Sequence, residues 1–307
     1  MNLRQEITEK IRKIAGDANV RVDEPMKDHT TMQVGGPAAL FVTPGSEQEI
    51  VRILKLLKEE RIPWYVLGNG SNVICRDEGY DGVILCLSGR FKGYEAKETE
   101  DGTVQVTVKA GTDNKEFAKE MADAGYAGFE FASGIPGSLG GATTMNAGAY
   151  DGEMKQIVQA VRILDPDGQI VLKSAEEMEF SYRHSLVSDG RSIVLETILA
   201  LHRDEPAKIR ERIADLTARR EEKQPLEYPS CGSTFKRPEG YFAGKLISDA
   251  GLKGFRLGGA QVSEKHAGFV INREHASAKD VLDLVEHIQR TVKESQGVTL
   301  ECEIKIL

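Results

Sequence analysis

The stretch from Phe131 to Tyr150 contains no charged side chain, and its twenty residues constrain the fold of this chain more than any other segment. Its length would suit a membrane span, but it is rich in Gly, Ser, Thr and Asn, which expose polar backbone. Each glycine costs backbone entropy on folding, so an ordinary turn uses one or two. This segment has more, which indicates that something large lies against the backbone; a tightly packed loop between domains is the alternative. The glycines are Gly134, Gly137, Gly140, Gly141 and Gly148.

A second glycine-containing loop, GNGSN, covers residues 68–72 and follows a short apolar strand predicted over 63–68. Its small residues leave several backbone N–H groups open to phosphate oxygens. It is not a dinucleotide fingerprint, because Val73 stands where the third glycine belongs. On its own, this loop is better explained as a plain turn than as a phosphate site. Together, the two loops predict a diphosphate-bearing cofactor, and FAD fits better than ATP because nothing resembles a magnesium site.

The composition limits the class of protein. The chain has 307 residues, 40% hydrophobic and 29% charged, with a net charge of −8. An acidic chain of this kind is poorly suited to nucleic acid or an anionic membrane, so a bound anion needs a local cationic site. The N-terminus lacks the apolar core of a signal peptide, so we expect a cytoplasmic protein. The four cysteines form no CxxC pair, which predicts reduced thiols and no metal site.

Strands and helices alternate along the chain, which predicts an α/β or α+β fold. Ser46 and Asp113 are suitable N-caps, and Ser277 with Asp280 resembles a capping box. The sequence becomes highly charged from Glu205 onward, where an amphipathic helix is predicted. This change in composition places a domain boundary near residue 203. Predicted strands cover 38–44, 63–68, 82–87, 103–111, 156–172 (two strands with an Asp-Gly turn), 192–201, 268–272 and 299–307. Predicted helices cover 46–61, 113–125 and 205–225, and a last one runs from 277 through 292.

The segment YPSCGSTFKRPEG, residues 228–240, combines candidate reactive groups with two cations. Cys231 or Ser233 could be a nucleophile or a proton carrier, and Lys236 and Arg237 could hold an anionic substrate. No base is spaced to activate Cys231, so we interpret its thiol as a packing group. An ordinary turn with solvated charges is the alternative for the whole segment.

Eight motifs, in order, resemble the UDP-N-acetylenolpyruvoylglucosamine reductases, also called UDP-N-acetylmuramate dehydrogenases. The resemblance covers nearly the whole chain and points to the shorter of the family's two forms, which lacks an extra loop in the substrate domain. The motifs are TTMQVGGPA (30–38), LGNGSN (67–72), GIPGSLGGATTMNAGAY (134–150), SYRHS (181–185), PSCGSTFKRP (229–238), FAGKLISDAGLKG (242–254), AQVSEKHAGFVIN (260–272) and GVTLECEIKIL (297–307).

The resemblance implies a three-domain flavoprotein. Residues 1–88 and 89–203 would form a FAD-binding fold of the vanillyl-alcohol-oxidase type, and residues 204–307 a substrate-binding α+β domain. It implies that NADPH reduces non-covalently bound FAD, which then reduces UDP-N-acetylglucosamine enolpyruvate to UDP-N-acetylmuramate in peptidoglycan precursor synthesis. No anchor for a covalent flavin stands out near GNGSN, and Cys75 and His29 are the alternatives for one.

The resemblance also assigns residues. Ser233 would be the proton donor, with Arg183 and Glu303 as the other catalytic groups. The predicted substrate-binding residues are Tyr182, Lys223, Lys236 and Arg237, with Lys265 and His266 as further candidates for the diphosphate. The predicted cofactor-binding residues are Gly68, Asn69, Gly70, Ser71, Asn72, Gly134, Ile135, Pro136, Gly137, Ser138, Gly140, Gly141, Thr143, Asn146 and Gly148.

The chemistry of the reaction suits these residue types. Hydride addition to the vinyl group leaves charge on the neighbouring carbon and its carboxylate, which Arg183 can stabilise through two N–H bonds. A serine can deliver a proton when nearby cations favour its oxyanion, and Glu303 can supply a proton or polarise the carboxylate. In the predicted terminal strand, Glu301, Glu303 and Lys305 would share one face, and Cys302, Ile304 and Ile306 the other.

Two other functions fit part of the sequence. A flavin oxidase acting on an alcohol or sugar would share the glycine loops but not the Ser, Arg and Glu set. A non-catalytic nucleotide-sugar binder would need no flavin chemistry. We expect a monomer whose partners are the substrate and NADPH, without nucleic acid or membrane.

Overall fold

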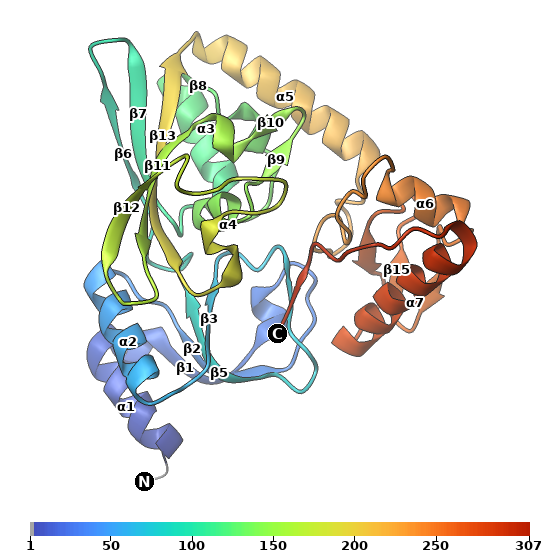
Figure 1. Cartoon of the computed structure of the whole chain (residues 1–307), viewed down its shortest axis with the longest axis horizontal. Helices are drawn as coiled ribbons and strands as arrows, with labels where there is room; N and C mark the ends of the chain where they lie inside the picture. The colour runs from blue at the N-terminus through green and yellow to red at the C-terminus, as the bar shows by residue number, and fades with distance from the viewer. Residues whose placement is uncertain (1–2) are drawn as a thin grey trace. The chain divides into compact units, whose positions relative to one another are not determined.

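The computed structural model describes residues 3–307, with side chains from Gln5 onward. Two compact units share the chain (Figure 1). Unit 1 comprises the residues up to Val22, Leu40–Asn69 and Gly82–Ala218. Unit 2 comprises Asp23–Ala39, Gly70–Asp81 and Arg219–Leu307. The three-domain division at residues 88 and 203 stays a prediction. No helix among the described residues is long and apolar enough to cross a membrane.

A four-stranded sheet in the order β1-β2-β5-β3 carries helices α1 and α2. Ser46 caps α2 as predicted, its hydroxyl accepting from the Glu49 N–H at 3.2 Å. The predicted apolar stripe of α2 is confirmed, because Ile50, Ile53, Leu54 and Leu57 are all buried. The bounds are α1 Leu3–Ala15, β1 Val20–Pro25, β2 Pro37–Val42, α2 Glu47–Glu59, β3 Trp64–Leu67 and β5 Tyr80–Cys86.

A six-stranded sheet forms the rest of unit 1, in the order β12-β11-β13-β7-β6, with β8 also paired to β13. The predicted hairpin over 156–172 is confirmed, since Leu164 pairs antiparallel with Ile170 across the turn. Strand β7 alternates buried and half-buried residues, as its sequence predicts. The bounds are β6 Tyr94–Glu98, β7 Thr103–Lys109, β8 Tyr126–Ala127, β11 Val158–Leu164, β12 Ile170–Ser174 and β13 Ile193–Arg203.

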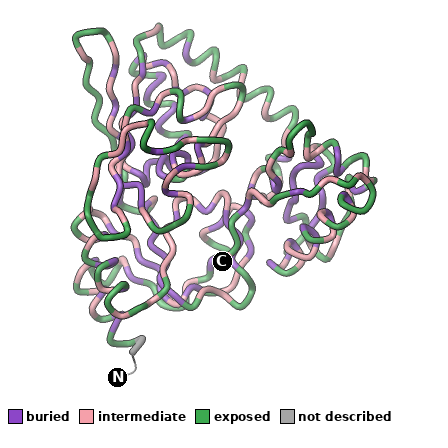
Figure 2. Tube along the Cα trace, viewed as in Figure 1, coloured by how far each residue is buried: buried purple, intermediate pink, exposed green. Residues whose placement is uncertain are grey.

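Helices α3 (Asn114–Ala124) and α4 (Leu139–Thr144) accompany this sheet. Asp113 caps α3 as predicted, accepting from two backbone N–H groups, and Gly125 ends it at φ +75°. The short hairpin of β9 (Gly148–Ala149) and β10 (Gly152–Glu153) follows α4. In Figure 2 the buried residues follow the strands of the sheet, whereas α5 (Pro206–Lys223) is mostly exposed.

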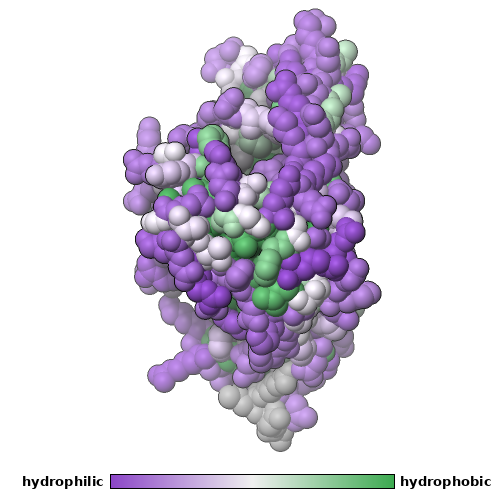
Figure 3. All heavy atoms as spheres, turned by 90° about the vertical axis from the view of Figure 1, so that its right-hand side faces the viewer, coloured by the Kyte–Doolittle hydropathy of each residue, from purple (hydrophilic) through white to green (hydrophobic). Residues whose placement is uncertain are grey.

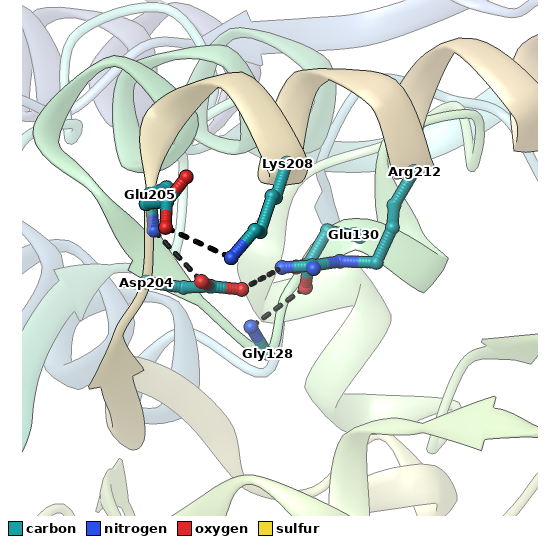
Figure 4. Close-up of polar contacts among 6 residues, drawn as sticks. All are labelled: Gly128, Glu130, Asp204, Glu205, Lys208 and Arg212. Atoms are coloured by element: carbon teal, nitrogen blue, oxygen red, sulfur yellow. Dashed lines mark hydrogen bonds and ion pairs between the residues drawn. The ribbon is translucent and has the colours of Figure 1, made fainter.

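A polar cluster fixes the first turns of α5 (Figure 4). Arg212 donates to Glu130 through Nε at 3.0 Å and Nη2 at 2.7 Å, and Nη2 also donates to Asp204 at 2.8 Å. Glu130 in turn accepts from the Gly128 N–H at 2.6 Å. Because Glu130 immediately precedes Phe131, the cluster fixes the entry to the uncharged segment as well as the helix.

Unit 2 is built around α7 (Ala278–Gln296) and a three-stranded sheet in the order β14-β15-β16. The capping box of Ser277 and Asp280 is confirmed, and the predicted apolar residues of α7 are buried: Val281, Leu284, Val285, Ile288 and Val292. The other bounds are β4 Val73–Ile74, α6 Ala243–Asp249, β14 Arg256–Leu257, β15 Ala260–Val262, β16 Val270–Asn272 and β17 Lys305–Ile306. Figure 3 shows one face of the molecule, on which hydrophilic residues cover most of the surface and hydrophobic ones gather near the centre.

The prediction of one continuous strand over 299–307 is wrong. Regular pairing is confined to β17, which runs parallel to β4, and to an isolated bridge between Phe235 and Cys302. Around Cys302 the segment pairs with an irregular loop, so the alternation of a strand does not extend through it. Ile304 is buried as predicted, but Ile306 is 41% exposed.

Asp77 supplies a cap that its sequence context did not reveal. Its two carboxylate oxygens accept from the Ala278 and Lys279 N–H groups, both at 2.8 Å, at the first turn of α7. We expect Asp77→Ala to lower the free energy of unfolding by about 1–2 kcal/mol, because two helix N–H groups lose an anionic acceptor. Urea denaturation measures this loss. Glu78→Ala, on the same exposed turn, is the control, and an equal loss there would contradict the capping role.

Candidate functional site

The two glycine-containing loops meet in unit 1. A Cβ on Gly68 would collide with the Ser138 hydroxyl, so glycine is required for this approach. Asn69 donates its side-chain amide to Asp113 at 2.6 Å, and the Asn114 N–H donates to the Gly137 carbonyl at 3.0 Å. The start of the first loop and the middle of the second are therefore joined through the start of α3.

The second loop packs closely on the end of β7. The Gly140 N–H donates to the Ala110 carbonyl at 2.8 Å, and a Cβ on Gly140 would lie 2.6 Å from that of Ala110. Ser138 caps α4, its hydroxyl accepting from the Gly141 N–H at 3.4 Å. Thr143 is fully buried and shares a hydrogen bond of 2.7 Å with Thr197 of β13. The remaining predicted residues here, Gly134, Ile135 and Pro136, are half-buried.

The other half of GNGSN, Gly70–Asn72, belongs to unit 2. Gly70 is buried at φ +62°, and a Cβ there would collide with the His29 carbonyl oxygen. Asn72 donates its side-chain amide to the Glu303 carbonyl at 3.1 Å, and its own carbonyl accepts from the Lys305 N–H at 2.9 Å. The loop is thereby tied to the C-terminal segment.

Both loops fit a diphosphate. Within residues 3–307, the backbone N–H groups of Asn69, Gly70 and Gly137 donate to no other residue, although Gly70 and Gly137 are buried. Buried N–H groups almost always have a partner. Donors of this kind beside glycines that leave no room for a side chain suit phosphate oxygens. The loops therefore have the donors that the predicted FAD needs.

Arg183 and Tyr182 lie beside the end of the second loop in unit 1. Arg183 Nη2 donates to the Gly148 carbonyl at 3.4 Å, and its guanidinium carbon lies 5.1 Å from the Tyr182 ring centroid. The buried Asn146 donates to the Ser181 carbonyl at 3.0 Å and to Glu153 at 2.8 Å. Arg183 adopts φ +54°, a conformation that is uncommon outside glycine and concentrates at functional positions.

Ser233 and Glu303 come together in unit 2. The Glu303 N–H donates to the carbonyl of Thr234, the residue after Ser233, at 2.9 Å. Phe235 and Cys302 form the adjacent bridge, and the Lys236 N–H donates to the Glu301 carbonyl at 2.8 Å. Ser233 is exposed between Gly232 and the buried Thr234. Gly232 is explained by its φ of +72°, since a Cβ there would meet no atom within 4 Å.

Cys231 does not have the properties of a nucleophile. It is 5% exposed, its thiol donates to the Val73 carbonyl at 3.5 Å, and burial raises its pKa to about 12. The thiol is therefore protonated near neutral pH, whereas the thiolate is the nucleophilic form. The two alternative anchors for a covalent flavin are also poor nucleophiles. Burial raises the pKa of Cys75 to about 11, and the His29 ring is paired with Glu24 at 2.8 Å.

The resemblance implies two half-reactions, flavin reduction by NADPH and flavin reoxidation by the enolpyruvyl substrate. We expect Cys231→Ser to change the rate of each by less than about threefold, since a hydroxyl can make the same hydrogen bond. In the folded protein, iodoacetamide should leave Cys231 unmodified when peptides are analysed by mass spectrometry. The same treatment in urea is the control and should label it. Rapid labelling of the folded protein would contradict this interpretation.

The predicted cations of unit 2 differ in their surroundings. Lys236 pairs with Glu301 at 3.3 Å, and the Arg237 guanidinium carbon lies 3.9 Å from the ring centroid of Phe242, which is 60% exposed. Lys223 is exposed at the end of α5. Lys265 donates to the Glu221 carbonyl at 2.6 Å. Burial lowers the pKa of His266, so this side chain is neutral at neutral pH and contributes no positive charge.

Sequence reasoning missed Thr31. Its hydroxyl donates to the Ser230 carbonyl at 2.6 Å, across 199 residues of sequence. The only signal was its place in TTMQVGGPA, a motif quoted for the resemblance and given no role.

Comparison with known proteins agrees with this geometry. Residues 38–172 match the model of an FAD binding domain, and residues 224–307 match that of the C-terminal domain of UDP-N-acetylenolpyruvoylglucosamine reductase. The reductase of that name from Clostridium perfringens is 48% identical over 307 residues, covering 100% of this chain and 99% of the relative. The one from Caldanaerobacter subterraneus is 46% identical over 301 residues, covering 98% of each.

A solved structure gives the same result. The crystal structure of UDP-N-acetylenolpyruvylglucosamine reductase from Thermus caldophilus superposes with a TM-score of 0.79 at 37% identity, covering 94% of this chain and 99% of that one. The predicted mixed α and β fold with an FAD-binding domain is confirmed. Its vanillyl-alcohol-oxidase type stays a prediction. These findings define the chain as an FAD-dependent oxidoreductase. It belongs to the UDP-N-acetylenolpyruvoylglucosamine reductase family.

Proposed function

We propose that this protein uses NADPH to reduce UDP-N-acetylglucosamine enolpyruvate to UDP-N-acetylmuramate through bound FAD. The full-length relationship to reductases of this name carries the proposal, since it spans every candidate residue. The hydride from NADPH ends on the terminal vinyl carbon, and a proton joins the carbon beside the carboxylate. The enol ether thereby becomes a lactyl ether.

When bound, FAD supplies a two-electron carrier between the nicotinamide and the substrate. In unit 1, Asn69 and Gly137 would hold its phosphate oxygens through their backbone N–H groups. Asp113 orients Asn69 by accepting from its side-chain amide. The adjacent Cys86 thiol donates to the Gly68 carbonyl at 3.8 Å and has a pKa raised by burial, which favours non-covalent binding.

Ser233 would give the proton to the substrate carbon. Ser233 is exposed, whereas Cys231, two residues before it, and Thr234, directly after it, are buried and hydrogen-bonded. Glu303, joined to Thr234 through the backbone, would polarise the substrate carboxylate or return a proton to Ser233. A serine placed in this way acts as a general acid only while neighbouring positive charge stabilises its oxyanion. Lys236 and Arg237 would provide that charge.

Arg183 would bind the substrate carboxylate, where negative charge gathers after hydride addition. A guanidinium can hold a carboxylate through two parallel hydrogen bonds, which fixes orientation as well as charge. Tyr182, 51% exposed beside it, would contact the substrate or the nicotinamide. Lys223 and Arg237 would bind the diphosphate of the substrate, and Lys223 also the NADPH phosphate.

Anaerobic stopped-flow spectroscopy tests the proposal with the purified flavoprotein. NADPH should bleach the oxidised-flavin absorbance, and UDP-N-acetylglucosamine enolpyruvate should restore it with one equivalent of product. The oxidase alternative is excluded by two results together. Alcohols and sugars should fail to reduce the oxidised flavin, and the enol ether should reoxidise the reduced flavin. Protein that binds no FAD, or reduced flavin that the enol ether leaves unchanged, would contradict the proposal.

A further inference from the structure

Thr31 links two loops that have separate predicted roles. Its backbone N–H donates to the Gly70 carbonyl at 3.1 Å, in the loop expected to hold the flavin. Its hydroxyl donates to the Ser230 carbonyl at 2.6 Å, three residues before the predicted proton donor. All three residues belong to unit 2, so this link lies within one compact body.

The flavin-side contact leaves Gly70 little freedom. Gly70 is buried, and a Cβ there would collide with the His29 carbonyl and come within 2.9 Å of the Thr30 Cα. The loop therefore rests directly on the backbone of residues 29–31. A movement of Gly70 would be transmitted to Thr31, because cores close-packed in this way do not deform locally.

The contact on the catalytic side limits where Ser233 can go. Cys231 is held by the Val73 carbonyl, and Thr234 is held at both ends, its N–H donating to Gly268 at 2.9 Å and its hydroxyl accepting from Val270 at 3.1 Å. Between these fixed points only Gly232 and Ser233 are left. Residues 230–234 therefore move as one piece, and the Thr31 hydroxyl fixes the start of that piece.

We propose that Thr31 is a positioning residue, whose hydroxyl holds the Ser230–Ser233 loop in register with the flavin loop so that Ser233 meets the substrate carbon. The proposal rests on the proposed role of Ser233 as proton donor. Proton transfer to carbon is sensitive to placement, and a displacement of about 1 Å can cost on the order of 100-fold in rate. Thr31 touches neither substrate nor flavin in this account and acts through Ser233.

Thr31→Val tests this, because it removes the hydroxyl and keeps the shape. We expect flavin reoxidation by the enolpyruvyl substrate to slow roughly tenfold, with flavin reduction by NADPH within about twofold of the unmodified protein. Thr31→Ser keeps the hydroxyl and should restore the rate. The control is Thr30→Val, which removes a local hydrogen bond of 3.2 Å to the Val34 carbonyl and should spare reoxidation.

A double-mutant cycle separates positioning from general destabilisation. If Thr31 acts through Ser233, Thr31→Val should slow reoxidation little further when Ser233→Ala is already present. Additive losses, equal slowing of both half-reactions, or Thr31→Ser matching Thr31→Val would overturn the inference. If Thr31→Val does not fold, Thr31→Ala against Thr31→Ser makes the same comparison.

The cycle also distinguishes the two proposals. Normal flavin reoxidation in Ser233→Ala would contradict the proposed role of Ser233 as proton donor. A severe loss in Ser233→Ala with no loss in Thr31→Val would leave the proposed function standing and contradict only the positioning role.

Discussion

Replacing Ser233 with Ala should slow reoxidation of the reduced flavin by the enolpyruvyl substrate roughly 10³-fold and leave flavin reduction by NADPH within a fewfold. General acids contribute on the order of 10²–10⁴ to a rate. Ser233 is an exposed residue in a loop that the buried, hydrogen-bonded Cys231 and Thr234 hold in place, which suits this role. The two half-reactions can be followed separately by anaerobic stopped-flow absorbance of the flavin. The variant should also fold normally, because its side chain fills no core.

A solvent isotope effect sharpens this test. If Ser233 delivers the proton, substrate reoxidation of the unmodified protein should be slower in D₂O, and Ser233→Cys should retain more activity than Ser233→Ala. Ser230→Ala, in the same loop, is the matched control, because it removes a hydroxyl and keeps the carbonyl that Thr31 binds. Equal losses in the two half-reactions of Ser233→Ala would instead indicate a damaged flavin site.

Local signals predicted most of the elements. Ser46, Asp113 and Ser277 each start a helix where the sequence places the cap, because side-chain capping is a property of a few neighbouring residues. The alternation of β7 also survives, since the strand packs on one face. Strand β6 was missed because all five of its residues are exposed, so no apolar pattern marks it.

Contacts between distant segments were not predictable in the same way. The terminal segment has the alternation of a strand, but its partner near Phe235 is an irregular loop, and nothing in either sequence states that pairing. Asp77 caps a helix about two hundred residues away, and Thr31 reaches Ser230 over a similar span. The resemblance supplied the candidate residues Ser233 and Glu303, but only the fold shows the backbone hydrogen bond between Glu303 and Thr234.

Replacing Arg183 should have the second-largest effect, because it would remove the charge that we propose to stabilise the developing carboxylate. We expect Arg183→Met to slow substrate reoxidation of the flavin roughly 10²- to 10³-fold, in the range found when one stabilising donor is removed. Arg183→Lys keeps the charge but loses the planar fork and the stacking on Tyr182, so it should recover only part of the rate. Flavin reduction by NADPH should change by a fewfold at most.

Arg191→Met is the matched control for this change. Arg191 lies in the same stretch of unit 1, but its side chain is 77% exposed and pairs with Asp189 at 2.6 Å on the surface. Exposed pairs of this kind contribute little, so both half-reactions should remain normal. If Arg183→Met kept its reoxidation rate, the carboxylate would have to be held by other cations. Lys236 and Arg237 would then stabilise the carboxylate, and replacing them should slow flavin reoxidation by the substrate instead.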